Sequence, residues 1–201
     1  MRYLFITGFI FMVAAQWYAP LSIVYDSEKT VEEGAEYRFR TAPVDPSDPF
    51  RGKYITLNFE AATYFPTDTN EVNFDAGQTV YATILPDSLG FAKVIQIAAE
   101  PPVIGIDYIT ATFEYGNRRY LYPDGELVPS SVVLEFPFQR LYVEESKASE
   151  AEKYYWTSRT DSTLVCYAVV KVLKGNTTLV DVMVNDRSLM DIVKEINTSQ
   201  D

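Results

Sequence analysis

Histidine is absent from this chain of 201 residues, and cysteine occurs once. Without histidine the chain lacks the commonest general base and the commonest metal ligand, so a Ser-His-Asp triad and a histidine-containing zinc site are excluded. A single cysteine cannot form an internal disulfide. Because Cys166 lies in the apolar run 162–173 and no histidine can activate it, we expect a small buried hydrophobic side chain there.

Glycine-rich motifs, internal repeats and basic patches are also missing. No glycine-rich turn opens an expected helix, so the phosphate-loop and dinucleotide-binding patterns are absent. The 17 basic residues are outnumbered by 28 acidic ones, which gives a formal net charge of −11. Such a chain offers no basic patch to displace counterions from a phosphate backbone, so we exclude nucleic-acid binding. These patterns predict neither a cofactor nor a metal site.

The longest apolar segment lies at the N-terminus. Residues 3–25 carry no charged side chain, Arg2 precedes them, and Asp26 begins the acidic stretch that follows. A helix needs about 20 apolar residues to cross a bilayer. Because positive charge stays on the cytoplasmic side, we expect residues 26–201 outside the cytoplasm, in the periplasm or on the outer face of the membrane.

Two other interpretations of this segment stay open. A cleaved signal peptide would have its apolar core over 3–13 and a cut after Ala15, and the mature protein would then be secreted. An ordinary buried helix is the second. We favour an uncleaved single-pass anchor because the apolar run continues through Tyr25, although Gln16 and Pro20 are awkward inside a span.

The rest of the chain divides into a short connection and one domain. Residues 26–35 are polar and acidic, which suits a juxtamembrane linker. Residues 36–201 contain short segments in which apolar and polar side chains alternate, separated by turn residues. This pattern predicts an all-β fold, mainly an antiparallel sandwich or barrel-like domain, with one or two short helices beside the N-terminal transmembrane or signal helix.

Individual elements can be placed approximately. Helical propensity favours short helices over 146–155 and 185–196. In the alternating segment 53–60, Ile55, Leu57 and Phe59 are expected to face the core. The expected strands cover residues 36–41, 53–60, 78–85, 92–98, 107–115, 131–143, 164–173 and 178–184. Within 131–143, Pro137 is expected to mark a break or an edge.

Charged side chains gather in two places. Asp45, Asp48 and Arg51 lie in a proline-rich loop, whereas Arg140 and Glu145 lie near the end of a later strand. Loop carboxylates usually cap turns, but the same oxygens suit a hard cation or acid–base catalysis, and the spacing matches no calcium loop. The arginines suit salt bridges that pin the loop to the sheet, or a clamp for an anion.

The proline-rich loop and the residues after it carry a family resemblance. Residues 43–59, PVDPSDPFRGKYITLNF, resemble the bacterial GDYXXLXY family, in which a P-x-D-P-x-D-P-x-R-G stretch precedes the motif that names the family. Lys53 stands where that motif has aspartate, and Phe59 stands where it has its final tyrosine. The positions that match the motif are Gly52, Tyr54 and Leu57.

A second block extends the resemblance. Residues 139–146, QRLYVEES, are similar to a later arginine-aromatic-valine-x-glutamate segment of the family, which aligns Arg140, Tyr142 and Glu145. The resemblance spans most of the chain. It implies a membrane-anchored bacterial protein that works beside a multi-pass membrane protein, and it brings no established activity.

Our leading hypothesis is a non-enzymatic binding or assembly module of the bacterial envelope. Each of the two blocks contains arginine, carboxylate and tyrosine, so we predict that the blocks meet in space and form one surface. The candidate binding residues are Asp45, Asp48, Arg51, Tyr54, Arg140, Tyr142 and Glu145.

Two alternatives remain. A carboxylate-dependent hydrolase or lyase would use Asp45, Asp48 or Glu145 together with Arg51. That chemistry requires a cleft that holds two of these carboxylates, one of them with a raised pKa. The other alternative is a purely structural partner within a membrane complex.

Overall fold

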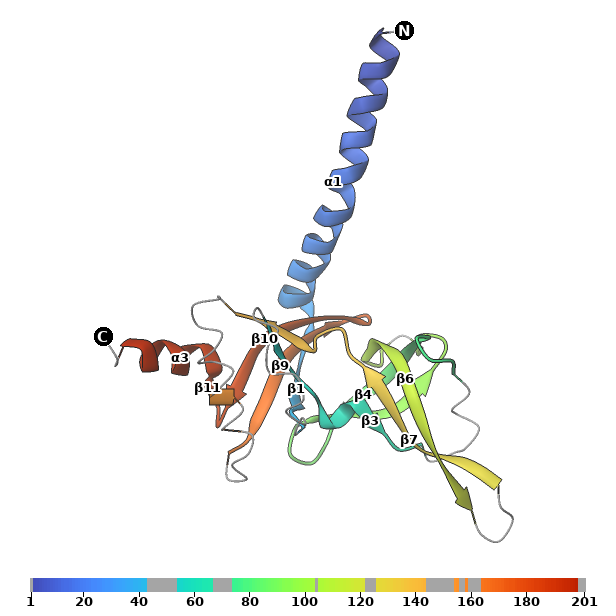
Figure 1. Cartoon of the computed structure of the whole chain (residues 1–201), viewed down its shortest axis with the longest axis vertical. Helices are drawn as coiled ribbons and strands as arrows, with labels where there is room; N and C mark the ends of the chain where they lie inside the picture. The colour runs from blue at the N-terminus through green and yellow to red at the C-terminus, as the bar shows by residue number, and fades with distance from the viewer. Residues whose placement is uncertain are drawn as a thin grey trace.

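The computed structural model describes residues 2–42, 54–66, 74–103, 105–121, 126–143, 154–155, 158 and 164–198. Helix α1 (Arg2–Glu33) extends away from a β-rich domain (Figure 1). Within the described residues, its segment Ile6–Glu33 is the one helix long and apolar enough to cross a membrane, by length and composition. The most apolar window of this helix is 0% buried, so α1 is not a core helix.

The base of α1 packs closely on the domain. The helix includes residues 26–33 of the expected linker, and its last turns contact β9 (Cys166–Leu173) and β10 (Asn176–Val184). At Gly34 the backbone nitrogen donates to the carbonyl oxygen of Thr30 at 3.0 Å. A Cβ atom at Gly34 would collide with that oxygen and lie 3.1 Å from the carbonyl oxygen of Val172. Helix α1 is therefore joined to the sheet by a close backbone contact.

Two larger sheets and one strand pair build the domain, and every ladder between the named strands is antiparallel. The four-stranded sheet has the order β1 (Ala35–Arg40), β9, β10 and β11 (Arg187–Ser188). The five-stranded sheet has the order β3 (Thr63–Tyr64), β7 (Glu126–Glu135), β6 (Tyr108–Leu121), β4 (Thr79–Pro86) and β5 (Ala92–Ala98). The remaining elements are the pair β2 (Tyr54–Thr56) and β8 (Arg140–Tyr142), a 3₁₀ turn (Glu60–Ala62) and α3 (Leu189–Thr198).

Isolated bridges bring the two larger sheets together into a nearly closed, barrel-like arrangement. Arg38 of β1 bridges to Phe91, immediately before β5, and Ile109 of β6 bridges to Gly175 in the β9–β10 turn. The enclosed core contains a cluster of aromatic rings, in which Phe39 lies 5.0 Å from Phe138 between ring centroids. This arrangement confirms the mainly antiparallel, barrel-like fold expected from the sequence.

Most local expectations hold. The hairpin over 164–173 and 178–184 is present as β9–β10, and Cys166 is buried. Within 53–60 the side chains of Ile55, Leu57 and Phe59 are buried as expected, although only the first residues form a regular strand.

The break expected at Pro137 is present, because Pro137 cannot donate a ladder hydrogen bond and separates β7 from β8. The helix expected over 185–196 begins only at Leu189, because a turn and β11 precede it. The helix expected over 146–155 lies outside the described residues apart from its last two positions.

Gly175 gives a direct test of how the hairpin closes the barrel. Its φ is +85°, and an added Cβ would lie 2.6 Å from the ring of Tyr108 and 2.7 Å from Oγ1 of Thr110. We expect Gly175→Ala to lower the free energy of unfolding by roughly 2–4 kcal/mol, from left-handed backbone strain and overpacking together. Gly77 is the control, because its φ is +84° and an added Cβ would meet nothing within 4 Å.

Gly77→Ala should cost only about 1 kcal/mol, from backbone strain alone. The measurement is urea denaturation of the detergent-solubilised full chain, followed by circular dichroism. Equal losses in the Gly175 and Gly77 variants would contradict the packing of the turn on β6.

Candidate functional site

The described residues of the two sequence blocks lie side by side. In the β2–β8 pair, Tyr54 is opposite Tyr142 and Thr56 is opposite Arg140. The backbone nitrogen of Leu57 extends the pairing by donating to the carbonyl oxygen of Gln139 at 2.8 Å. The blocks are separated by 79 residues in the sequence, so the fold brings them together.

Three side chains on this pair form a cluster that we call the Tyr54–Arg140–Tyr142 cluster. The rings of Tyr54 and Tyr142 meet edge to face with 5.9 Å between centroids. The guanidinium carbon of Arg140 lies 5.1 Å from the centroid of the Tyr54 ring, within cation–π range. Tyr142 is 69% exposed and Arg140 is also exposed, while Ile55 behind them is buried. The cluster is therefore an accessible surface on a fixed backing.

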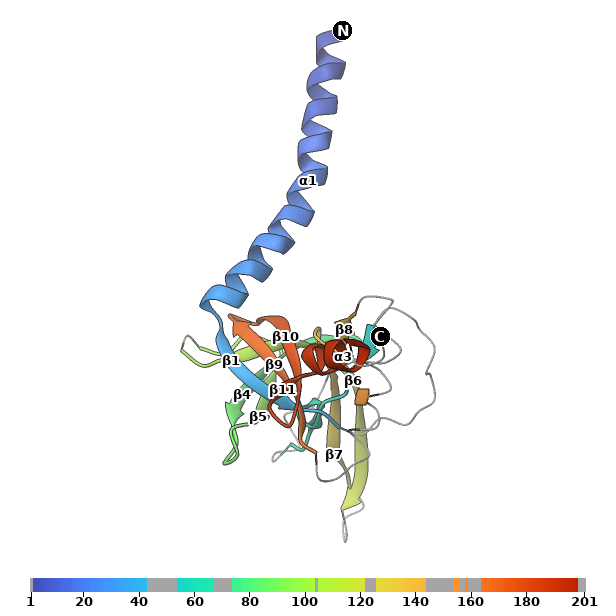
Figure 2. The same ribbon diagram turned by 90° about the vertical axis from the view of Figure 1, so that its left-hand side faces the viewer.

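The β2–β8 pair lies at the end of the domain from which α1 leaves. Figure 2 labels β8 on this side, and β2 is paired with it. The tip of the β6–β7 ribbon points the opposite way (Figure 1). The cluster and the base of the helix thus belong to the same end of the molecule.

The remaining predicted site residues cannot be placed. Asp45, Asp48, Arg51 and Glu145 lie outside the described residues. The hydrolase or lyase alternative depends on these carboxylates, so no geometry supports it. Within the described part of the chain, no group of three or more histidine, cysteine, aspartate or glutamate side chains could hold a metal ion.

A groove that the sequence did not reveal lies between α1 and the two larger sheets. Its volume is about 510 Å³. One wall is a single face of α1, made by Ile23, Asp26, Ser27 and Thr30 at the spacing of successive helical turns. The other walls come from β4, β6, the end of β7 and the β9–β10 turn, and the residues there are Thr79, Thr110, Ala111, Thr112, Glu135, Phe136, Pro137, Gly175, Asn176, Thr177 and Thr178.

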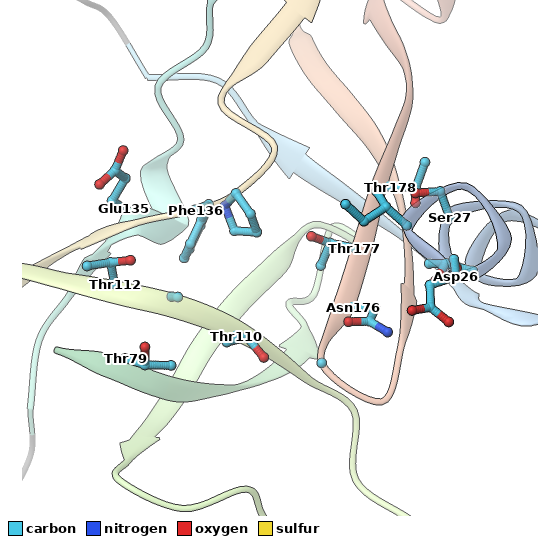
Figure 3. Close-up of a pocket in the computed structure, with 15 residues that line it drawn as sticks. Asp26, Ser27, Thr79, Thr110, Thr112, Glu135, Phe136, Asn176, Thr177 and Thr178 are labelled. Carbon is cyan, nitrogen blue, oxygen red and sulfur yellow. Dashed lines mark hydrogen bonds between the residues drawn. The ribbon is translucent and has the colours of Figure 1, made fainter. Parts of the chain in front are cut away.

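Nine of the fifteen lining residues carry a hydroxyl or carboxylate group and none is lysine or arginine, although the greater part of the exposed lining surface is apolar. Figure 3 shows Glu135 on one side of the groove and Asp26 on the other, with Thr110 and Thr177 between them. Thr177 contributes a buried Oγ1 that has no hydrogen-bond partner within the described residues. The groove therefore offers hydrogen-bond acceptors and negative charge to a bound group.

The sequence held only faint signals for this groove. The spacing of Ile23, Asp26 and Thr30 marks one helix face, and the alternation of Thr110 and Thr112 marks one strand face. Neither pattern is unusual by itself. The groove is created by contacts among distant segments, which no local pattern reports.

The shifted pKa values belong to structural contacts. Burial raises the pKa of Tyr37 to about 12, assisted by the hydrogen bond that its hydroxyl donates to Asp107 at 2.7 Å. Burial likewise raises the pKa of Tyr167 to about 12, and its hydroxyl donates to Asp186 at 2.5 Å. The backbone N–H groups of the β4–β5 turn, first that of Phe91, lower the pKa of the Asp87 carboxyl. Each shift moves the pKa of the group further from neutral pH, so none of these groups is poised for acid–base catalysis.

Substitution of Tyr142 tests whether the cluster is a surface or part of the core. Because Tyr142 is 69% exposed, we expect Tyr142→Ala to lower the free energy of unfolding by less than about 1 kcal/mol. Ile55→Ala on the paired strand is the control and should cost roughly 2–5 kcal/mol, because that side chain is buried. Urea denaturation measures both, and equal costs would contradict a freely accessible cluster.

Comparison with known proteins supports the resemblance seen in the sequence. The family model described as GDYXXLXY protein matches residues 16–182. That range includes the β2–β8 pair and every residue that lines the groove. No curated protein and no solved structure matches the chain. Because the family match covers most of its length, the chain belongs to the GDYXXLXY family.

Proposed function

We propose that this protein is a single-pass membrane-anchored binding or assembly module of the bacterial envelope. Its β-domain lies outside the cytoplasm and presents the Tyr54–Arg140–Tyr142 cluster to a partner. The observation that carries the proposal is the pairing of the two family blocks at the end of the domain from which α1 leaves.

Charge distribution supports the orientation. Arg2 precedes the apolar segment, whereas the stretch 26–33 that follows it carries four acidic side chains and one basic side chain, Lys29. Basic residues are retained on the cytoplasmic side of a spanning helix. Since Gly34 joins α1 closely to β9, the domain is held near the membrane surface on the other side.

The composition of the cluster supports a protein partner. Tyrosine and arginine are enriched among the residues that dominate binding energy at protein interfaces. Arg140 is already positioned over the Tyr54 ring, so its side chain loses less conformational freedom when it binds. A partner that supplies a carboxylate or backbone carbonyl beside an apolar surface would bind Arg140 through that oxygen and the tyrosine rings through the apolar surface. Proximity to the membrane favours a multi-pass membrane protein.

Orientation is tested by labelling with a membrane-impermeant maleimide. Ser88 is exposed in the β4–β5 turn, and the native Cys166 is buried, so Ser88→Cys introduces the reactive thiol. We expect this variant to be labelled in intact spheroplasts, and a chain with a cysteine added before Met1 to be labelled only after permeabilisation. The reverse pattern would contradict the proposed orientation.

Partner binding is tested by photo-crosslinking in native membranes. A benzoylphenylalanine at Tyr142 should give an adduct with a membrane protein, and the same group at Ser88 should not. Arg140→Glu should reduce the Tyr142 adduct about tenfold or more, because it opposes a charge-assisted contact. Arg187→Glu is the matched control, since Arg187 is an exposed arginine on β11. Equal loss with both arginine variants would contradict a specific role of the cluster.

A further inference from the structure

The groove beside α1 is independent of the Tyr54–Arg140–Tyr142 cluster and suggests a second interaction. We propose that it binds the headgroup of a membrane phospholipid that carries a primary ammonium group. The inference rests on the proposed anchoring of α1 in the membrane. It does not depend on the protein partner.

The position of α1 in the proposed membrane places the groove at the depth of the lipid headgroups. If residues 3–25 span the hydrocarbon, Tyr25 lies at its outer boundary. At a helical rise of about 1.5 Å per residue, Thr30 lies roughly 8 Å beyond that boundary. The headgroup layer on each side of a bilayer is about 5–7 Å thick. The α1 wall of the groove, from Ile23 to Thr30, therefore crosses the headgroup layer.

The location and the size of the groove suit part of a lipid. Figure 2 shows the lower part of α1 leaning over the end of the domain, and the groove lies between the helix and the sheets. Its volume of about 510 Å³ is within the usual range of small-ligand sites. Ile23 is an exposed apolar side chain at the end of this wall that enters the proposed span. The groove thus has an apolar side chain at its membrane end, and Phe136 and Pro137 add apolar surface on the sheet side.

The polar groups that line the groove suit a primary ammonium group. Asp26 and Glu135 supply carboxylates on opposite sides, and the hydroxyl-bearing side chains of Thr110 and Thr177 lie between them, although Oγ1 of Thr177 itself is buried (Figure 3). A primary ammonium donates three hydrogen bonds and carries positive charge, so it fits acceptors and carboxylates. A trimethylammonium group has no N–H donor, and an anionic glycerol headgroup is repelled. The lipid phosphate would remain outside the groove, because no lysine or arginine lines it.

The test is native mass spectrometry of the full chain released from nanodiscs made of equal parts phosphatidylethanolamine, phosphatidylcholine and phosphatidylglycerol. We expect the retained lipid to be enriched about tenfold in phosphatidylethanolamine, which corresponds to the free energy of one charge-assisted hydrogen bond. Asp26→Asn and Glu135→Gln keep the side-chain size but remove the charge, so each should lower the enrichment several-fold. Thr110→Val removes one hydroxyl at similar size and should lower it less.

Glu28→Gln is the matched control. Glu28 lies on the same helix and is exposed, but it does not line the groove, so its substitution should leave the enrichment unchanged. Equal retention of the three lipids by the native chain would overturn the proposal. An equal loss in the Glu28 and Asp26 variants would also overturn it, because the effect would then reflect general surface charge.

A parallel extraction separates this proposal from the proposed function. Membranes are washed with alkaline carbonate before the lipid measurement. If the chain stays in the membrane but shows no lipid preference, the headgroup site is refuted and the anchored binding module stands. If the wash releases the chain, the anchoring fails, and both proposals fail with it.

Discussion

The close contact between the base of α1 and the four-stranded sheet is the constraint on which the rest of the structure depends. Gly34 permits it, because any side chain there would collide with the carbonyl oxygen of Thr30 and press on Val172. Thr30 is buried in the same place. The apolar helix is therefore not connected through a loose linker, and its direction relative to the four-stranded sheet is set by this contact.

Closure of the barrel depends on a second backbone approach. The backbone nitrogen of Thr110 on β6 donates to the carbonyl oxygen of Gly175 at 3.0 Å, which draws the β9–β10 turn against the five-stranded sheet. The same turn supplies Asn176 and Thr177 to the groove. The contact that closes the barrel therefore also forms part of the groove, and the base of α1 provides the remaining wall of the groove.

Sequence patterns predicted the parts of this fold that are decided locally. Alternation placed Ile55 and Leu57 in the core, and the turn residues around Gly175 predicted the β9–β10 hairpin. The hypothesis that the two family blocks meet did not specify which residues pair, and the position of Tyr54 opposite Tyr142 came from the structure, since no local pattern specifies a contact between distant strands. The groove was missed because its residues become neighbours only when α1, β6 and the β9–β10 turn pack together.

Membrane depth is the measurement that tests the account most directly. Spin labels at Asn176→Cys and Ser88→Cys, in a Cys166→Ala background and in nanodiscs, report collision with lipid-soluble oxygen and with a water-soluble nickel complex. Asn176 begins β10 beside the base of α1. Ser88 lies in the turn before Phe91, which bridges to Arg38 in the part of β1 that is more distant from the helix. The account predicts that the label at 176 lies in the headgroup layer and the label at 88 in water. Equal exposure of both labels to the nickel complex would contradict it.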